Sequence, residues 1–258
     1  MLSYMWFKEN INYVFVILFL VLVACDEKKH TVTRVTSETT TIDQNIPEAQ
    51  DLTARIAPFK NRLDQEVDSI LAYAPQTLSK KDTPYNTAIG NMMADAVFEL
   101  ANPIFKKRVG YPFHAVLLNY GGIRAPLNKG NVTTRTAYTI MPFENEIVVV
   151  ELSGKHIKDM FRYLEKGIAH PISGMTIELD KEGNLKEARI QGRTIEDGET
   201  YLIATTDYLQ NGGDHMNFFA KPISKLDLDY KMRNVLIDYF KQKDTIAPVA
   251  DQRFFKSN

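Results

Sequence analysis

Apolar residues recur every three or four positions in several stretches of the chain, and this spacing predicts amphipathic helices. Four helices are predicted in this way, over residues 52–71, 86–100, 155–164 and 230–240. Pro58 lies inside the first, where we expect a kink or a restart because proline lacks the backbone N–H that a helix interior uses. Thr87, or Asn86 before it, is suited to cap the second helix, and Ser153 the third.

Shorter runs of apolar and β-branched residues predict strands. They cover residues 114–119, 146–152, 175–179, 185–190 and 200–206. The third and fourth flank the turn-forming sequence Asp180-Lys181-Glu182-Gly183-Asn184, which is typical of a hairpin. Because helices and strands do not alternate regularly, the pattern favours a single α+β domain, with mixed α/β content and helices packed on mixed sheets, over residues 47–258.

The N-terminal segment has a different character. An unbroken apolar run from Tyr13 to Ala24 follows Lys8, and it is shorter than the roughly 20 residues that span a membrane as a helix. It matches the hydrophobic region of a secretion signal. The run ends in Leu22-Val23-Ala24-Cys25, which resembles a bacterial lipobox, so we predict a lipoprotein signal peptide over residues 1–24 and lipidation of Cys25. The alternative is an uncleaved anchor helix with an incidental cysteine.

A lipidated Cys25 would hold the protein on a bacterial membrane in the cell envelope, at its periplasmic or surface face. Each buried CH₂ of an acyl chain contributes about 0.8 kcal/mol to such an anchor. Residues 25–46 are polar and rich in threonine, without an apolar period. They are predicted to form a flexible tether between the lipid and the domain, with no specific partner of their own.

Charge and cysteine content exclude several classes of function. The 258 residues contain 31 Lys and Arg against 32 Asp and Glu, a net charge of −1, so there is no basic field to hold a nucleic acid polymer. The single cysteine rules out an internal disulfide framework and a cysteine-based zinc site. No two histidines have metal-ligand spacing beside carboxylates, so no metal site and no cofactor are predicted in this chain; the histidines are His30, His114, His156, His170 and His215.

Three segments combine glycine or proline with polar and aromatic residues close to predicted strands. The first, residues 119–124 (NYGGIR), has glycines that leave room for a ligand and ends in Arg124, a planar fork suited to phosphate or carboxylate. In the second, residues 141–145 (MPFEN), Phe143 either fills the core or offers a face for stacking, and Asn145 carries a donor and an acceptor. The third, residues 207–215 (DYLQNGGDH), holds a second aromatic residue and an aspartate suited to accept from hydroxyl groups. Each segment alone is also compatible with an ordinary turn.

Taken together, the three segments resemble the C-terminal domain of bacterial and animal 5′-nucleotidases. The resemblance rests on the order NxGGIR, PFxN and an aromatic residue shortly before GGD, and residues 89–96 are similar to the opening helix of that domain. It implies that two aromatic side chains sandwich a nucleotide base, that two asparagines lie beside the base, and that an aspartate bonds the ribose. The arginine would hold the polar end of the substrate, and the glycines would line the site. The implied substrate-binding residues are the aromatic pair Phe143 and Tyr208, the asparagines Asn119 and Asn145, the aspartate Asp214, the arginine Arg124, and the glycines Gly121, Gly122 and Gly213.

The chain departs from that family in two ways. The family's enzymes carry a metallophosphoesterase domain with motifs such as DxH, GNH[DE] and GHxH, none of which occurs in the sequence, so we expect no catalytic residue in this chain and no catalysis by it alone. Relatives also place one or two arginines before the opening helix, where this sequence has Lys80 and Lys81. Lysine is a point charge without the bidentate fork of arginine, so whether these residues replace the arginines is open.

The leading hypothesis is that the chain is the nucleotide-recognition half of a split 5′-nucleotidase. A separately encoded metallophosphoesterase would supply catalysis and divalent metals, and the predicted helix over residues 52–71 is one surface on which it could dock. Two alternatives are a lipoprotein that binds nucleosides or nucleotides without hydrolysis, and a structural remnant of the fold. The resemblance also leaves open other phosphate, sulfur or nucleotide-sugar substrates, among which the aromatic pair favours one with a base.

Overall fold

A computed structural model describes residues 31–43 and 45–257 of the chain, which divide into two units. The first unit ends at Asp51, and its residues 31–43 are exposed and contain no helix or strand. The second unit starts at Leu52 and holds all of the strands described below. The predicted signal peptide and Cys25 lie outside the described residues. Within the described part, no helix has the length and apolar character needed to cross a membrane.

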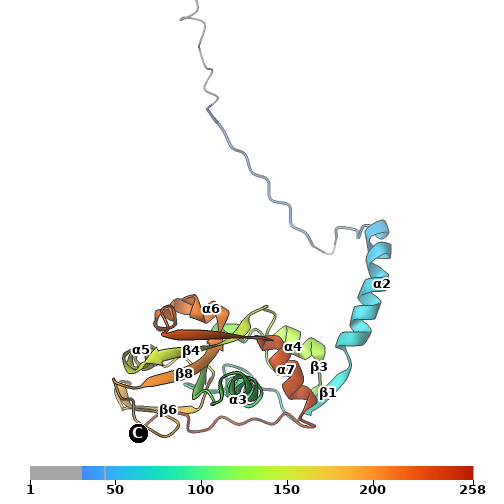
Figure 1. The fold of residues 1–258 in the computed structure, drawn as a ribbon. Helices are drawn as coiled ribbons and strands as arrows, with labels where there is room; N and C mark the ends of the chain where they lie inside the picture. Colours follow the sequence, from blue (N-terminus) through green and yellow to red (C-terminus); the bar gives the residue numbers. More distant parts are fainter. Residues whose placement is uncertain (1–30, 44, 258) are drawn as a thin grey trace, which may run out of the picture. The chain divides into compact units, whose positions relative to one another are not determined.

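The folded unit combines helices with strands of both orientations (Figure 1). The helices are α2 (Gln50–Val67), α3 (Ala88–Val109), α4 (Thr134–Ile140), α5 (Gly154–Leu164), α6 (Asp207–Gln210) and α7 (Met232–Lys241). The strands are β1 (Ile70–Ala74), β2 (Ala115–Leu117), β3 (Gly130–Thr133), β4 (Glu146–Ser153), β5 (Ile172–Ser173), β6 (Met175–Leu179), β7 (Leu185–Ile190), β8 (Thr200–Thr206), β9 (Ser224–Lys231) and β10 (Phe254–Lys256).

The central sheet has five strands in the order β5–β2–β8–β4–β9. Strands β2 and β8 are parallel, whereas the other three pairs are antiparallel. A second sheet has the order β10–β6–β7, with the predicted hairpin β6–β7 antiparallel and β10 parallel to β6, and β1 pairs with β3. The predicted α+β class with mixed sheets is confirmed.

Both faces of the central sheet are buried. Alternate residues of a strand point to opposite faces, so neighbouring residues of one strand belong to different cores. Val149 and its cross-strand partner Ala204 belong to one core, together with apolar residues of α3 and α7. The next pair, Val150 and Ile203, belongs to a second core with residues of α5 and β6. This two-sided burial explains why β4 and β8 read as continuous apolar runs, and it fixes the ends of these strands in space.

The second predicted helix begins as expected and ends later. Thr87 caps α3 by accepting a hydrogen bond from the Gly90 N–H at 3.2 Å. The helix then continues past Pro103 to Val109, because Ala101 and Phe105 extend its buried face. Gly110, at φ 95°, closes it in the left-handed conformation. The predicted helix over residues 230–240 starts only at Met232, since Tyr230 and Lys231 still belong to β9.

The first predicted helix is present, but its apolar side is not covered. α2 runs unbroken through Pro58, has no buried residue, and leaves Phe59 77% exposed. Ile70, which the periodicity includes in the helix, belongs to β1 instead. The helix is attached through its polar side, because Arg135 of α4 donates to Asp64 in the helix and to Asp68 just after its end, at 2.6 Å each. Its apolar stripe, defined as Leu52, Ile56, Phe59 and Leu63, is therefore exposed.

Candidate functional site

The predicted site residues converge at one edge of the central sheet. Eight of the nine line a single hollow of about 240 Å³, which we call the strand-edge hollow; they are Asn119, Gly121, Gly122, Arg124, Phe143, Asn145, Tyr208 and Asp214. Two of the three segments follow the parallel neighbours β2 and β8, and the third precedes the antiparallel neighbour β4. The ends of parallel strands and the start of an antiparallel one meet at the same edge, so the topology brings the segments together.

Asn119 connects the first segment to the third. It is buried at the end of β2, just before a tight turn over Tyr120–Gly122. Its Nδ2 donates to the Asp214 Oδ2 at 2.7 Å. A Cβ on Gly122 would lie 2.8 Å from the Asn119 Oδ1, closer than side-chain carbons approach, so glycine is required for this asparagine rotamer.

Three side chains hold Asp214: Asn119 and Tyr208 bond its carboxylate, and Tyr163 bonds its backbone carbonyl. Its backbone adopts φ 51°, a left-handed conformation that aspartate tolerates better than most residues. The Tyr208 hydroxyl donates to Oδ1 at 2.9 Å, and the Tyr163 hydroxyl donates to the backbone carbonyl at 2.9 Å. The bond to the Asp214 carboxylate raises the pKa of Tyr208, so this tyrosine keeps its proton. The carboxylate thus has a fixed position at the hollow and retains lone pairs for a ligand.

The two aromatic side chains of the hollow keep accessible faces. Phe143 is 40% exposed and Tyr208 is 44% exposed, so neither fills the core. Gly213 does not line the hollow, but a Cβ there would lie 2.5 Å from the Tyr208 ring. The absence of a side chain at Gly213 therefore allows Tyr208 to lie against the turn that carries Asp214.

The cations near the hollow differ in availability. Arg124 is exposed, makes a long 3.4 Å bond to the Gly121 carbonyl, and lies with its guanidinium carbon 5.7 Å from the Phe143 ring centroid. Lys80 donates to the carbonyls of Ile123 and Tyr120 at 2.7 and 3.3 Å, and burial is the main cause that lowers its pKa. Lys80 thus supports the Asn119–Arg124 loop from behind and does not line the hollow.

The described residues do not form a cluster of metal ligands. In that part of the chain, no three His, Cys, Asp or Glu side chains lie close enough together to hold a metal ion. The donors at the hollow are one carboxylate, two amides and a phenol. These residues do not fit a metal centre, and the arrangement is suited to recognition of a polar, partly aromatic ligand.

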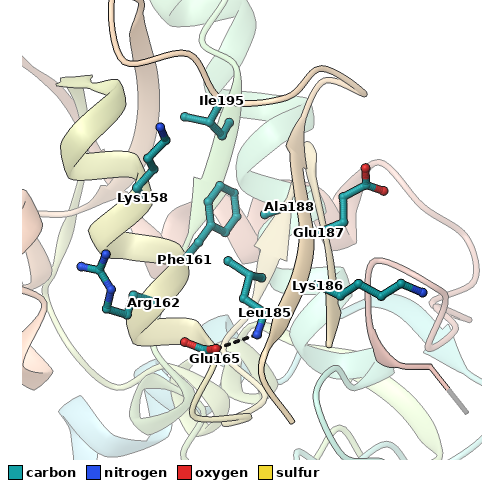
Figure 2. A pocket seen from close by; sticks show the side chains of 9 residues that line it. All are labelled: Lys158, Phe161, Arg162, Glu165, Leu185, Lys186, Glu187, Ala188 and Ile195. Carbon is teal, nitrogen blue, oxygen red and sulfur yellow. Dashed lines mark hydrogen bonds between the residues drawn. The ribbon is translucent and has the colours of Figure 1, made fainter. Parts of the chain in front are cut away.

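Another hollow of about 380 Å³ lies between α5 and β7 (Figure 2). Phe161 and Leu185 contribute to its apolar floor. Each charged side chain around it already has a partner: Lys158 binds Asp197, Arg162 binds Asp159, Lys186 binds Glu178, Glu187 binds Arg189, and Glu165 accepts from the Leu185 N–H. Although larger, this hollow offers no uncommitted charge among the described residues, in contrast to the exposed Arg124 at the strand-edge hollow.

Sequence reasoning missed side chains that hold the site without lining it. Arg233 of α7 contacts the loop of Phe143, and Asp207 accepts from the backbone N–H groups of Glu146 and Tyr208. Arg233 is about ninety positions from Phe143 along the chain, and no local pattern marks it. Asp207 lies inside the third segment but has the composition of an ordinary helix start.

Comparison with known proteins identifies the family. The model of the family described as 5′-nucleotidase, C-terminal domain, matches residues 68–221, which is more than half of the chain. The chain belongs to the 5′-nucleotidase C-terminal domain family. The match begins after α2 and includes all three segments of the strand-edge hollow.

Proteins with similar sequences come from an insect and a bacterium. An apyrase of Tabanus yao is 26% identical over 231 residues, which cover 80% of this chain and 41% of the apyrase. The trifunctional nucleotide phosphoesterase protein YfkN of Bacillus subtilis is 25% identical over 234 residues, which cover 82% of this chain and 15% of that protein. The chain therefore spans less than half of the length of these relatives.

Solved structures support the same fold. A 5′-nucleotidase precursor from Thermus thermophilus superposes with a TM-score of 0.66 at 20% identity, covering 82% of this chain and 44% of that one. The NAD nucleotidase of Haemophilus influenzae gives a TM-score of 0.61 at 19% identity, covering 81% and 42%. At these identities the likeness shows the fold alone.

Proposed function

We propose that this chain is the nucleotide-recognition half of a two-chain 5′-nucleotidase. The observation that carries the proposal is the strand-edge hollow, in which two accessible aromatic faces, a fixed carboxylate and an exposed guanidinium occur together in a domain of this family. The relatives named above are an apyrase and a nucleotide phosphoesterase by description, and the chain covers less than half of each.

In this proposal the base stacks between Phe143 and Tyr208. Stacking of a base on an aromatic side chain contributes about 1–3 kcal/mol, and the accessible faces of both rings support it. Asn145, whose amide makes no hydrogen bond to another described residue, offers a donor and an acceptor to the edge of the base. Asn119 offers its remaining amide groups on the other side of the hollow.

Asp214 accepts hydrogen bonds from the ribose hydroxyls. Its carboxylate is held by Asn119 and Tyr208 before any ligand arrives, so little conformational freedom is lost on binding. Arg124 attracts the phosphate end, because it is exposed and has no carboxylate within ion-pair distance among the described residues. Of the two lysines considered from the sequence, Lys80 is committed to backbone carbonyls and has a supporting role, and Lys81 does not line the hollow.

Hydrolysis in this proposal belongs to a separate metallophosphoesterase chain, which brings the divalent metals and the attacking water. Its docking surface is the apolar stripe of α2. The stripe is exposed, the opposite side of α2 is attached to the domain through Asp64 and the following Asp68, and α2 directly precedes the region that matches a C-terminal domain. Lipidation of Cys25 and the tether over residues 25–46 would keep this assembly at a bacterial membrane in the cell envelope.

Ligand binding is tested by the thermal unfolding of the purified protein with adenosine, AMP, ADP and UMP. A ligand at a hundred times its dissociation constant stabilises the folded state by about 2.7 kcal/mol, which raises the unfolding temperature. We expect a shift that is lost in Phe143→Ala and Tyr208→Ala. The matched control is Tyr73→Ala, because Tyr73 is as exposed as Tyr208 and lies outside the hollow. No shift with any of the four ligands would refute recognition by this chain alone.

The two-chain arrangement is tested by AMP hydrolysis with a separately encoded metallophosphoesterase from the same source. We expect the mixture to exceed the activity of the phosphoesterase alone. Phe59→Asp should abolish the gain while nucleotide binding is retained. Gln65→Asp, an exposed change on another face of α2, is the control and should keep the gain. A tight nucleoside complex without any gain in hydrolysis would favour the alternative of a non-catalytic binding lipoprotein.

A further inference from the structure

The loop that carries Phe143 is fastened from behind by a buried arginine. Arg233, in the first turn of α7, is only 5% exposed. Its Nη1 donates to the carbonyl of Pro142 at 3.3 Å and makes a longer contact of 3.5 Å with the carbonyl of Phe143. Its Nη2 donates to the carboxylate of Glu144, and its guanidinium carbon lies 4.0 Å from the ring centroid of Tyr138. One planar group therefore contacts three consecutive residues of the loop.

Neighbouring groups of α7 and β9 strengthen this attachment. Lys231 also donates to Glu144, at 2.5 Å, and these two cations lower the pKa of Glu144 to about 2. The Met232 N–H donates to the carbonyl of Asn145 at 2.9 Å. The start of α7 thus binds the loop from Pro142 through Asn145, which includes both residues that this loop contributes to the strand-edge hollow.

A second link joins this loop to the segment of the other aromatic residue. The Asp207 Oδ1 accepts from the Glu146 N–H at 3.1 Å and from the Tyr208 N–H at 2.8 Å. Glu146 is the first residue of β4, three positions after Phe143. One carboxylate oxygen therefore links the backbone of Tyr208 to the first residue of β4, three positions after Phe143.

The choice of arginine at residue 233 distinguishes this contact from ordinary core packing. Burying a guanidinium costs free energy, and its Nε atom is buried without a hydrogen-bond partner among the described residues. An apolar side chain would fill the space beside Tyr138 without that cost. Arginine has the planar fork that reaches a carbonyl and a carboxylate at once, which lysine lacks.

We infer that Arg233 is a positioning residue of the nucleotide site, which acts by holding Phe143 and Asn145 at the geometry that a base requires. The inference rests on the proposed function. Arg233 touches no ligand, because it does not line the strand-edge hollow. Its effect on binding passes through Phe143, and that dependence separates positioning from a general contribution to stability.

The test compares dissociation constants for adenosine by calorimetry, well below the unfolding temperature. Arg233→Lys keeps the charge and loses the fork, and we expect about ten-fold weaker binding. Arg253→Lys is the matched control, because Arg253 is also largely buried and binds Asp95 through two bonds of 2.8 and 2.9 Å away from the hollow. We expect it to lower stability and leave the dissociation constant within two-fold of that of the unchanged protein.

A double-mutant cycle decides whether the effect passes through Phe143. In a Phe143→Ala background, Arg233→Lys should weaken binding less than two-fold, because the ring that it positions is gone. The inference is overturned if Arg233→Lys leaves adenosine binding unchanged, if it costs the same factor with and without Phe143, or if Arg253→Lys weakens binding equally.

A measurement without ligand tests the positioning of residue 143 independently of whether the protein binds nucleosides. In a Phe143→Trp reporter, Arg233→Lys should shift the tryptophan emission and increase quenching by acrylamide, whereas Arg253→Lys should change neither. An unchanged reporter would overturn the positioning role whether or not nucleosides bind. A changed reporter in a protein that binds no nucleoside would refute the proposed function and retain the clamp as a property of the loop.

Discussion

Acid should weaken this protein through one buried histidine under the site. His170 is 4% exposed, and its Nδ1 accepts a hydrogen bond of 3.1 Å from the Tyr120 N–H, at the start of the loop that carries Arg124. An accepting Nδ1 requires the neutral ring with its proton on Nε2. The perturbation is therefore a decrease in pH, which adds a proton to a ring that the folded state holds neutral.

The magnitude follows from the pKa of this ring. Burial lowers the pKa of His170 from 6.5 to about 4; the nearby Asp214 and the Leu118 carbonyl favour the charged form, and Lys166 opposes it, but burial dominates. His170 takes up a proton near pH 6.5 in the unfolded chain and near pH 4 in the folded chain. Its contribution to the free energy of unfolding is therefore fully present above pH 6.5 and is lost progressively as the pH falls from 6.5 to 4. The loss from this group reaches about 2.5 kcal/mol at pH 4.5, and about 3.4 kcal/mol once both states are protonated.

The assay is urea unfolding at pH 7.5, 6.5, 5.5 and 4.5, for the unchanged protein and for His170→Gln. Glutamine does not titrate and offers an oxygen to the Tyr120 N–H. Carboxylates and His114, whose pKa is also lowered mainly by burial, titrate in both proteins and cancel in the comparison. We expect the free energy of unfolding of the unchanged protein to fall by about 2.5 kcal/mol more than that of the variant by pH 4.5. Parallel curves, with a constant difference across this range, would refute the reasoning.

Three further predictions concern single side chains. Arg124→Ala should weaken AMP binding about ten-fold and leave adenosine binding unchanged, since only AMP carries the phosphate; equal losses in calorimetry would contradict this role. Gly213→Ala places a Cβ 2.5 Å from the Tyr208 ring and should displace it, so adenosine affinity should fall, and a crystal structure with an unmoved ring would show the expectation to be wrong. Arg253→Ala leaves the Asp95 and Asp251 carboxylates without their common partner and should lower the free energy of unfolding by about 2 kcal/mol in urea, a figure reduced for their partial exposure; an unchanged midpoint would rule this out.

The composition of the strand-edge hollow was predictable because its residues break local rules. Gly122 in the hollow and Gly213 beside it are needed where another residue comes too close for a Cβ, and Phe143 lies in a proline loop next to the polar Glu144. Such features are visible in a short stretch of sequence. The structure places the three segments together because β2, β8 and β4 are neighbours in the sheet, an arrangement that their order along the chain does not fix.

Other parts of the fold were not predictable from local pattern. The two-residue strand β5 and the three-residue β10 are too short to show alternation and exist because neighbouring strands supply their hydrogen bonds. The edge strand β9, by contrast, does alternate, with Leu226 and Leu228 apart from Asp227, so its pattern was a strand signal that the sequence analysis missed. The periodicity of α2 predicts the helix correctly but gives no information about what covers it. Its apolar stripe is exposed in this chain, and periodicity alone would have assigned the stripe to the core.

The two aromatic residues of the hollow are held by different kinds of interaction. Tyr208 is fixed locally, by its own hydroxyl on Asp214 six positions away and by the glycine that lets its ring approach. Phe143 is fixed by Arg233, from a helix about ninety positions later. The Tyr208 side of the site therefore depends on its own turn and on Asn119 and Tyr163, which bond Asp214, whereas the Phe143 side requires that α7 has docked. In the proposed function, nucleotide affinity therefore depends on the docking of α7, which lies away from the ligand.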